Sequence, residues 1–396
     1  MIKYPYSKPE VTKSDILEVK KVLDGGYLSQ GEKIKEFEFE LSKDFKSQNI
    51  IVCNSGTAAL HLIYMALGLG PKAGLLTSPI TFLATANAAK MCNAPVVFAD
   101  VDCKSGLMTA DTIEQALKKS KYKIKVITVV HLGGKLCDLE SIAEVAKKYN
   151  CLIVEDASHS PGAVYHNKNF NKSKIESNRY SIASTFSFNA IKHIAMGEGG
   201  CVATNDSKIA NKIRSLRSHG MLRNKEKFLY KQSENAPWYY EMHDLGWNYR
   251  ADELSCALGL NQLKRLQKNI TKRKTLVKYY LNELKDVKLI ILPADAKSIN
   301  KSVWHLYPIL INFKKIGISR SKMIELLLKS GIQTQVHYIP LFLQPYYREK
   351  NISSYKGAMS YYESTLSLPL YVQLTKKDII FISSKIKSII LNVNSM

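Results

Sequence analysis

Short apolar runs rich in β-branched residues recur through the first 204 residues, and helical patterns separate most of them. The runs lie at 50–53, 75–78, 96–99, 125–131, 151–155, 182–186 and 201–204. Hydrophobic periodicity predicts helices between them, at 57–68, 82–90, 110–119 and 139–149. Strands that are apolar along their whole length expose apolar side chains on both faces of a sheet, so both faces must be buried by other elements. The pattern therefore predicts an α/β fold with a large, mostly parallel sheet between layers of helices.

The rest of the chain predicts a second, smaller unit. With 396 residues, the chain is too long for a single small core. A large domain is expected at 1–250, beginning with a helix at 14–23 that Asp24-Gly25-Gly26 ends. Residues 251–285 predict a linking helical stretch. A small C-terminal α+β domain is expected at 286–396, with strands near 305–312 and 332–338 and helices near 320–330 and 375–390.

The charge balance is strongly basic, with 57 Lys and Arg against 34 Asp and Glu, a formal net charge of +23. Only nine of the basic residues are Arg, and the 48 Lys are spread along the chain without a block of five or six. Because Arg suits bidentate contacts with bases and phosphates better than Lys, a nucleic-acid-binding face is not expected. A solvated Lys-rich surface is the favoured interpretation, with a diffuse field that attracts anionic small molecules as the alternative.

The seven Cys are widely spaced and contain no Cys-x-x-Cys pair. Free thiols in a reducing cytoplasm are therefore expected, and no metal site. The first residues lack the apolar core of a signal peptide, and no uncharged apolar stretch of about 18 residues predicts a membrane span. We expect a soluble cytoplasmic protein without a membrane partner.

The first chemical motif is Asn54-Ser55-Gly56-Thr57-Ala58, a turn of small residues between a predicted strand and a predicted helix. Free backbone N–H groups at the helix start, the Thr57 hydroxyl and the helix dipole form a pocket suited to a phosphate. An ordinary capped helix has the same local sequence, so both interpretations stay open at this point.

The second motif is Glu155-Asp156 at the end of an apolar strand. Open α/β sheets place their ligands at the carboxyl ends of the strands, which favours a functional carboxylate. Asp156 fits a metal ligand, a structural helix cap or a partner for a protonated ring nitrogen, and the strand alone does not choose between them.

The third motif is the segment 185–200, where Lys192 lies among apolar, small and Gly residues. This setting indicates partial burial, which lowers the pKa of a Lys and makes a nucleophilic amine of the kind a Schiff base requires. A structural or surface Lys is the alternative. Ser187 can add a hydroxyl to the phosphate pocket.

Together these segments can hold pyridoxal 5'-phosphate, since they provide a phosphate pocket, a carboxylate for the pyridine nitrogen and an amine for the aldehyde. Their order is that of an aspartate-aminotransferase-like fold. Phe82, just after a predicted strand, can support the ring of the cofactor.

At these residues the chain resembles the sugar aminotransferases of the DegT/DnrJ/EryC1/StrS family, pyridoxal-phosphate enzymes of fold type I. The resemblance covers nearly the whole chain. It includes the segments 26–31, 54–58, 81–87, 155–157, 197–200, 217–221, 248–250 and 257–260. Within the family, the segments 238–242 and 337–347 look most like the members of pseudaminic-acid biosynthesis, which aminate C4 of a UDP-linked keto sugar.

The resemblance implies a role for each matching position. Lys192 matches the lysine that binds the cofactor covalently, and Asp156 the carboxylate at the pyridine nitrogen. Asn248 matches a residue that reaches the phosphate of the neighbouring subunit's cofactor, which implies a homodimer with shared active sites. The other implied cofactor contacts are Gly56, Thr57, Ala58 and Ser187 at the phosphate, Phe82 on the ring and His159 near the 3'-oxygen. Tyr6, His337 and Tyr338 are the candidates for substrate binding.

The implied reaction transfers an amino group from glutamate to the 4-keto group of a nucleotide-linked 4-keto-6-deoxy sugar, with UDP as the expected nucleotide. 2-Oxoglutarate is released, and pyridoxamine 5'-phosphate is the intermediate form of the cofactor. Amination at C3, or of a GDP- or dTDP-linked sugar, is the alternative, and a non-catalytic regulator that binds the cofactor is another. Two departures from the family pattern bear on the identity of the sugar substrate. They are Asn189, where the family usually has His or another ring, and Glu32, where Pro is usual. The presence of Lys192 favours transamination over the dehydration that relatives with His at this position perform.

Overall fold

Seven strands form the central sheet, in the order β1-β9-β8-β5-β4-β2-β3. The computed structural model describes residues 2–166, 172–174, 178–230, 236–348 and 352–393. The strands are β1 (Asn49–Cys53), β2 (Gly74–Thr77), β3 (Val96–Phe98), β4 (Ile124–Val130), β5 (Leu152–Asp156), β8 (Ala183–Ser187) and β9 (Gly200–Thr204). Each coincides with a predicted run. Only β9 runs in the direction opposite to the other six strands of this sheet, which confirms a mostly parallel sheet.

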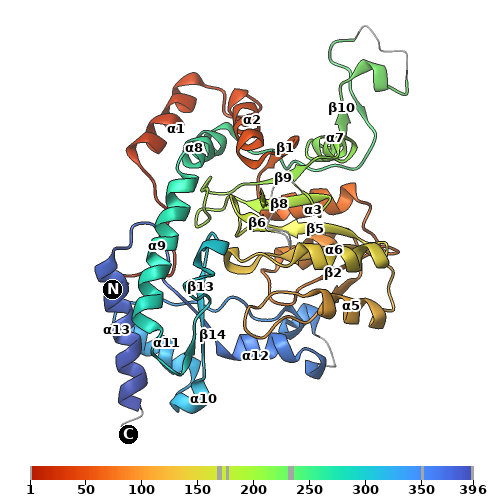
Figure 1. Cartoon of the computed structure of the whole chain (residues 1–396). Coiled ribbons are helices and arrows are strands. Elements are labelled where there is room, and N and C mark those ends of the chain that lie inside the picture. The colour runs from red at the N-terminus through yellow and green to blue at the C-terminus, as the bar shows by residue number, and fades with distance from the viewer. Residues whose placement is uncertain (1, 167–171, 175–177, 231–235, 349–351, 394–396) are drawn as a thin grey trace.

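Helices cover both faces of the sheet because alternate strand residues point into two separate cores (Figure 1). Leu76, Ile127 and Ile153 pack against α5 (Ala110–Lys119) and α6 (Leu139–Lys148). Their strand neighbours pack on the other face against α3 (Gly56–Ala66) and α7 (Ser207–Leu216). The predicted helices correspond to α3, α4 (Ala84–Met91), α5 and α6, while α7 and α2 (Glu32–Phe45) were not predicted.

The helix predicted at 14–23 is α1 (Lys13–Gly25), which begins with a capping box between Thr12 and Asp15 and ends at Gly26, whose φ is 76°. The predicted helical stretch after residue 250 is two helices, α8 (Glu253–Leu263) and α9 (Leu266–Leu284). In Figure 1, α9 runs from α8 towards the second sheet.

The second sheet is antiparallel and consists of β12 (Ile290–Ile291), β13 (Tyr307–Ile311) and β14 (Thr365–Leu368). It packs against α9, α11 (Arg320–Lys329) and α13 (Lys376–Val393). The strand predicted near 332–338 is wrong. This segment makes only isolated bridges, from Ile332 to Tyr4 and from Gln335 to Ser367, because the N-terminal residues and β14 contact it at single points. The boundaries between domains stay a prediction.

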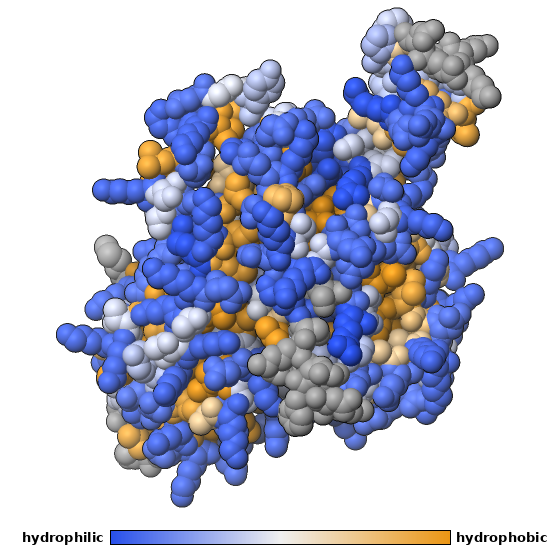
Figure 2. All heavy atoms as spheres, turned by 45° about the horizontal axis from the view of Figure 1, so that its top comes forward, coloured by the Kyte–Doolittle hydropathy of each residue, from blue (hydrophilic) through white to orange (hydrophobic). Residues whose placement is uncertain are grey.

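An arm, described at residues 217–230 and 236–248, leaves the body after α7. It contains β10 (Met221–Leu222) paired with β11 (Glu241–Met242). It projects from the body in Figures 1 and 2, and Figure 2 shows that hydrophilic side chains cover most of the visible face. None of the seven Cys forms a disulfide, and four of them are buried. Among the described residues, no helix combines the length and apolar character needed to cross a bilayer. The described part of the chain also contains no cluster of His, Cys, Asp and Glu that could hold a metal ion.

Candidate active site

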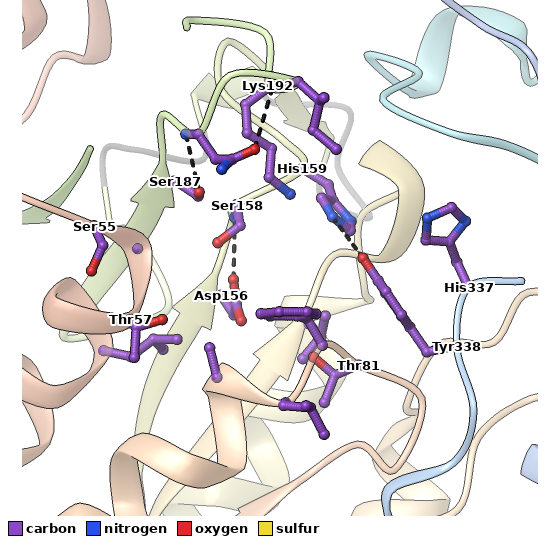
Figure 3. A pocket seen from close by; sticks show the side chains of 18 of the residues that line it. Ser55, Thr57, Thr81, Asp156, Ser158, His159, Ser187, Lys192, His337 and Tyr338 are labelled. Atoms are coloured by element: carbon purple, nitrogen blue, oxygen red, sulfur yellow. Dashed lines mark hydrogen bonds between the residues drawn. The ribbon is translucent and has the colours of Figure 1, made fainter. Parts of the chain in front are cut away.

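A cavity of about 560 Å³ opens at the carboxyl ends of the parallel strands. Its lining includes Asp156 at the end of β5, Ser187 at the end of β8, and Gly56 and Thr57 at the start of α3, directly after β1. This is the location where open α/β sheets bind ligands. Figure 3 shows Thr57 on one side and Tyr338 and His337 on the other, with Lys192 and Asp156 between them.

The start of α3 forms one side of the cavity. The Ser55 hydroxyl caps the helix by accepting a hydrogen bond from the Ala58 N–H at 3.0 Å. The N–H groups of Gly56 and Thr57 precede the first intrahelical hydrogen bond, so they are free to bind an anion. A Cβ at Gly56 would lie 2.8 Å from the Ser187 Cβ, so only Gly allows the helix start to approach β8 this closely.

Ala58 does not line the cavity, since its side chain is buried and its N–H is used by the cap.

Asp156 is buried, and both of its oxygens accept hydrogen bonds. Thr85 Oγ1 donates to Oδ2 at 2.7 Å, and the Ser158 N–H donates to Oδ1 at 3.2 Å. Because the Thr85 proton is used in this way, Thr81 Oγ1 is the donor of the 2.8 Å hydrogen bond between the two threonines. A chain from Thr81 through Thr85 thus holds the carboxylate in one orientation. The motifs did not predict Thr81 and Thr85 as site residues, because Thr81 precedes α4 and the helical pattern does not place it beside Thr85.

Lys192 lies on a hairpin between β8 and β9, where the N–H groups of Phe188 and Ala190 bond to the carbonyls of Gly199 and Gly197, each at 2.8 Å. Its side chain is half-buried and points into the cavity (Figure 3). Burial lowers the pKa of Lys192 to about 8, while the negative charge of Asp156 acts in the opposite direction. The environment that the sequence predicted for this residue is therefore present.

The opposite side of the cavity comes from the C-terminal part of the chain. Tyr338 Oη lies 3.4 Å from His159 Nε2, and the Phe82 and Tyr338 rings are 6.3 Å apart. His337 is buried and hydrogen-bonded to Ser367 at 2.9 Å, and burial lowers its pKa to about 3. Tyr6 reaches the cavity because the N-terminal segment pairs with Ile332 and Leu370.

Gln335, Gln344 and Glu198 also line the cavity and were not predicted. Asn189, the departure noted above, donates from Nδ2 to Glu198 Oε1 at 2.7 Å. Asn248 is exposed at the base of the arm and does not line this cavity. Every other predicted site residue except Ala58 lies at the cavity, and their roles stay predictions.

One cavity at the edge of this sheet combines a half-buried lysine, a buried carboxylate and a helix N-terminus with free N–H groups. Together with the fold, these features define an aminotransferase of fold type I. The chain belongs to the DegT/DnrJ/EryC1/StrS aminotransferase family, whose model matches residues 9–387.

The known proteins agree with this assignment. The chain is 36% identical to the UDP-4-amino-4,6-dideoxy-N-acetyl-beta-L-altrosamine transaminase of Campylobacter jejuni, over 97% of each sequence. The structure is similar to that of PseC from Helicobacter pylori, an aminotransferase of pseudaminic-acid biosynthesis, with a TM-score of 0.87 and 31% identity over 98% of this chain and 99% of that one. It is also similar to a Streptococcus pneumoniae protein in its PLP form, with a TM-score of 0.85 and 26% identity over 98% and 99%.

Proposed function

We propose that this aminotransferase moves an amino group from glutamate to the 4-keto group of a UDP-linked 4-keto-6-deoxy sugar, with pyridoxal 5'-phosphate as cofactor. The observation that carries the proposal is the convergence of Lys192, Asp156 and the start of α3 on one cavity. Family membership, the similarity to a UDP-amino-sugar transaminase and the similarity to an aminotransferase of pseudaminic-acid biosynthesis support the same conclusion.

The residues present fit the cofactor. Because residue 56 is Gly, the start of α3 can lie close to β8. The N–H groups of Gly56 and Thr57 and the Ser187 hydroxyl are then available at one end of the cavity to bind a phosphate. No hydrogen bond within the described residues uses the Lys192 amine, which leaves it available for an aldehyde. His159 is expected near the 3'-oxygen of the ring, and Phe82 is the candidate to stack on it.

When bound, pyridoxal phosphate provides a conjugated ring that takes up the electron pair released as a C–H bond next to nitrogen breaks. The carboxylate of Asp156, oriented by Thr85 and Ser158, stabilises positive charge on the ring nitrogen. Burial keeps a fraction of Lys192 uncharged near neutral pH, so its Nζ can take up a proton from the amino donor and return it. Positioned proton transfer of this kind contributes about 10²–10⁴-fold to a rate.

The sugar side of the cavity offers groups suited to a polar, partly apolar ligand. Tyr6, Tyr338, Gln335 and Gln344 present hydroxyls and amides beside the apolar ring of Phe82. This set matches a deoxy sugar with hydroxyl and amide substituents. The Lys-rich surface favours the approach of an anionic nucleotide sugar without determining its identity.

The test is incubation with pyridoxal phosphate, glutamate and a panel of UDP-, GDP- and dTDP-linked keto sugars, with products identified by NMR. We expect a 4-amino sugar from a UDP-linked 4-keto-6-deoxy substrate. Amination at C3, or amination of only GDP- or dTDP-linked sugars, would refute the proposed substrate but would still be consistent with a sugar aminotransferase. Cofactor binding without turnover of any sugar would instead favour the regulator.

We also propose that two chains form a homodimer with shared sites. Asn248 does not line the cavity of its own chain. The arm exposes the large side chains of Trp238 and Met242, while α1 exposes Ile16 and Leu17. Exposed apolar residues of this size indicate a contact surface. The absence of a disulfide at any of the seven Cys supports the cytoplasm as the compartment.

A mixing experiment tests the shared site. Lys192→Ala and Asn248→Asp should each inactivate the enzyme alone, the second by placing a negative charge at a phosphate. After subunit exchange, one of the two sites in each hybrid dimer has both native residues, so about a quarter of the wild-type activity should return. Hybrids detected by native mass spectrometry that remain inactive would contradict sharing.

A further inference from the structure

Two buried imidazoles are stacked behind the wall of the cavity. His159 follows β5, and His305 lies on the segment that leads into β13 of the second sheet. Their ring centroids are 4.4 Å apart with an angle of 26° between the planes. His159 lines the cavity and His305 does not, so His305 can influence a ligand only through its neighbour.

The peptide of Gly133 connects the two histidines. Its N–H donates to His159 Nδ1 at 3.2 Å, and its carbonyl accepts the backbone N–H of His305 at 2.9 Å. Gly133 has φ +67°, and a Cβ at Gly134 would lie 2.9 Å from the Trp304 backbone nitrogen. A turn that requires glycine therefore holds the segment around His305 against His159.

This geometry determines where His159 carries its proton. Because Nδ1 accepts a hydrogen bond from a backbone N–H, the neutral ring has its proton on Nε2. Burial lowers the pKa of His159 well below its usual value, and the nearby Lys192 adds to the effect. The Nε2–H group then donates to Tyr338 Oη, 3.4 Å away, and the Tyr338 hydroxyl proton is left for another acceptor.

We propose that His305 is a positioning residue whose ring face holds the His159 ring where Nδ1 accepts the Gly133 N–H. His159 then keeps its proton on Nε2, and Tyr338 presents its hydroxyl proton to an acceptor oxygen of the ligand in the cavity. His305 Nδ1 is buried and has no hydrogen-bond partner among the described residues, so the contact that matters is the ring face. The proposal rests on the proposed function only for the nature of that oxygen, a hydroxyl, carbonyl or phosphate oxygen of the nucleotide sugar.

The test uses ¹⁵N-histidine-labelled enzyme without added ligand, observed by long-range ¹H–¹⁵N NMR, with His159→Gln to assign the His159 signals. We expect a single Nε2–H tautomer of His159 in the wild type and in His305→Phe, which keeps a flat ring. His305→Leu, similar in volume but without a ring face, should give exchanging tautomers. An Nδ1–H tautomer in the wild type, or an unchanged signal in a folded His305→Leu, would overturn the proposal.

Kinetics provide a second measurement that does not depend on His305→Leu alone. Tyr338→Phe and His305→Leu should each raise the KM for the keto sugar about tenfold, the value of one hydrogen bond, with the KM for glutamate unchanged. The double variant should be no worse than either single one, and His305→Phe should be close to wild type. Additive losses would show that the two residues act independently. Because the NMR result needs no substrate, failure of the sugar panel and failure of this proposal are distinguishable.

Discussion

The two walls of the cavity are built differently. The inner wall lies at the ends of hydrogen-bonded strands and at the start of a capped helix, and it contains Asp156, Ser187, Gly56 and Lys192. The outer wall, residues 335–344 with Tyr6, has no strand and is joined to the body at a few points. One of these is the 2.9 Å hydrogen bond from the Leu341 N–H to the Pro79 carbonyl.

This difference separates reaction chemistry from substrate selection. Groups that transfer protons or stabilise charge must be held in a fixed geometry, and strand ends and caps provide that rigidity. A segment outside the sheet can change its side chains without disturbing strand pairing, so it suits the recognition of a particular sugar. Substitutions in the inner wall should therefore lower turnover, whereas those in the outer wall should change KM.

The largest effect is expected from Lys192→Ala, which removes the amine and should lower turnover by at least about 10³-fold. Lys135 is a matched control, because burial lowers its pKa to about 8 as well, but it does not line the cavity. Lys135→Ala should keep kcat within a few-fold. Steady-state assays with glutamate and the keto sugar check both variants, and an active Lys192→Ala enzyme would rule out the proposed chemistry.

A smaller loss is expected along the chain of hydrogen bonds to Asp156. Asp156→Asn removes a negative charge and should lower kcat by about 10²–10³-fold. Thr85→Val removes one hydrogen bond to that carboxylate and should lower kcat about tenfold. Thr81→Val should lower kcat less, because Thr81 contacts Thr85 and not Asp156 itself. Equal losses of kcat for the two threonine variants would show that Thr81 does not act on Asp156 through Thr85.

In the outer wall, Gln335→Ala and Tyr6→Phe should raise the KM for the keto sugar about three- to tenfold, since each removes one polar contact. The half-reaction with glutamate should be unchanged, which a single-turnover measurement of 2-oxoglutarate release can check. An equally large decrease in the rate of the glutamate half-reaction would show that the outer wall is not specific to sugar recognition.

The smallest expected effect is on stability. Below about pH 8, Lys192 is protonated in both the folded and the unfolded chain, so the full cost of burying its charge opposes folding. Between about pH 8 and 10.5, the unfolded chain binds more protons at this residue, and stability rises with pH. Lys192→Met should therefore be more stable than the wild type near pH 7, by at most about 3 kcal/mol, and this advantage should shrink towards pH 10.5.

Denaturant unfolding at several pH values checks this expectation, with Gln335→Met as a control that has no titrating group. A stability difference between Lys192→Met and the wild type that does not vary with pH would contradict a buried charge at Lys192.

The inner wall was largely predictable because its residues follow local patterns. Asp156 ends an apolar strand, and Lys192 lies in an apolar, Gly-rich segment, so their environments are visible in neighbouring residues. The outer wall was less predictable. The pattern at 332–338 resembles a strand, but only isolated bridges form there, and β14 was missed because its four residues depend on pairing with β13.

The sequence by itself determined the parallel sheet, the order of the motifs and the type of chemistry, since continuous apolar strands and small-residue turns impose local structure wherever they occur. Only the tertiary structure decided that Thr85 orients Asp156, that His305 stacks on His159 and that Tyr6 reaches the cavity. These contacts join residues far apart in the chain. Local hydrophobic periodicity predicts helices and strands, but tertiary packing determines which distant side chains come into contact.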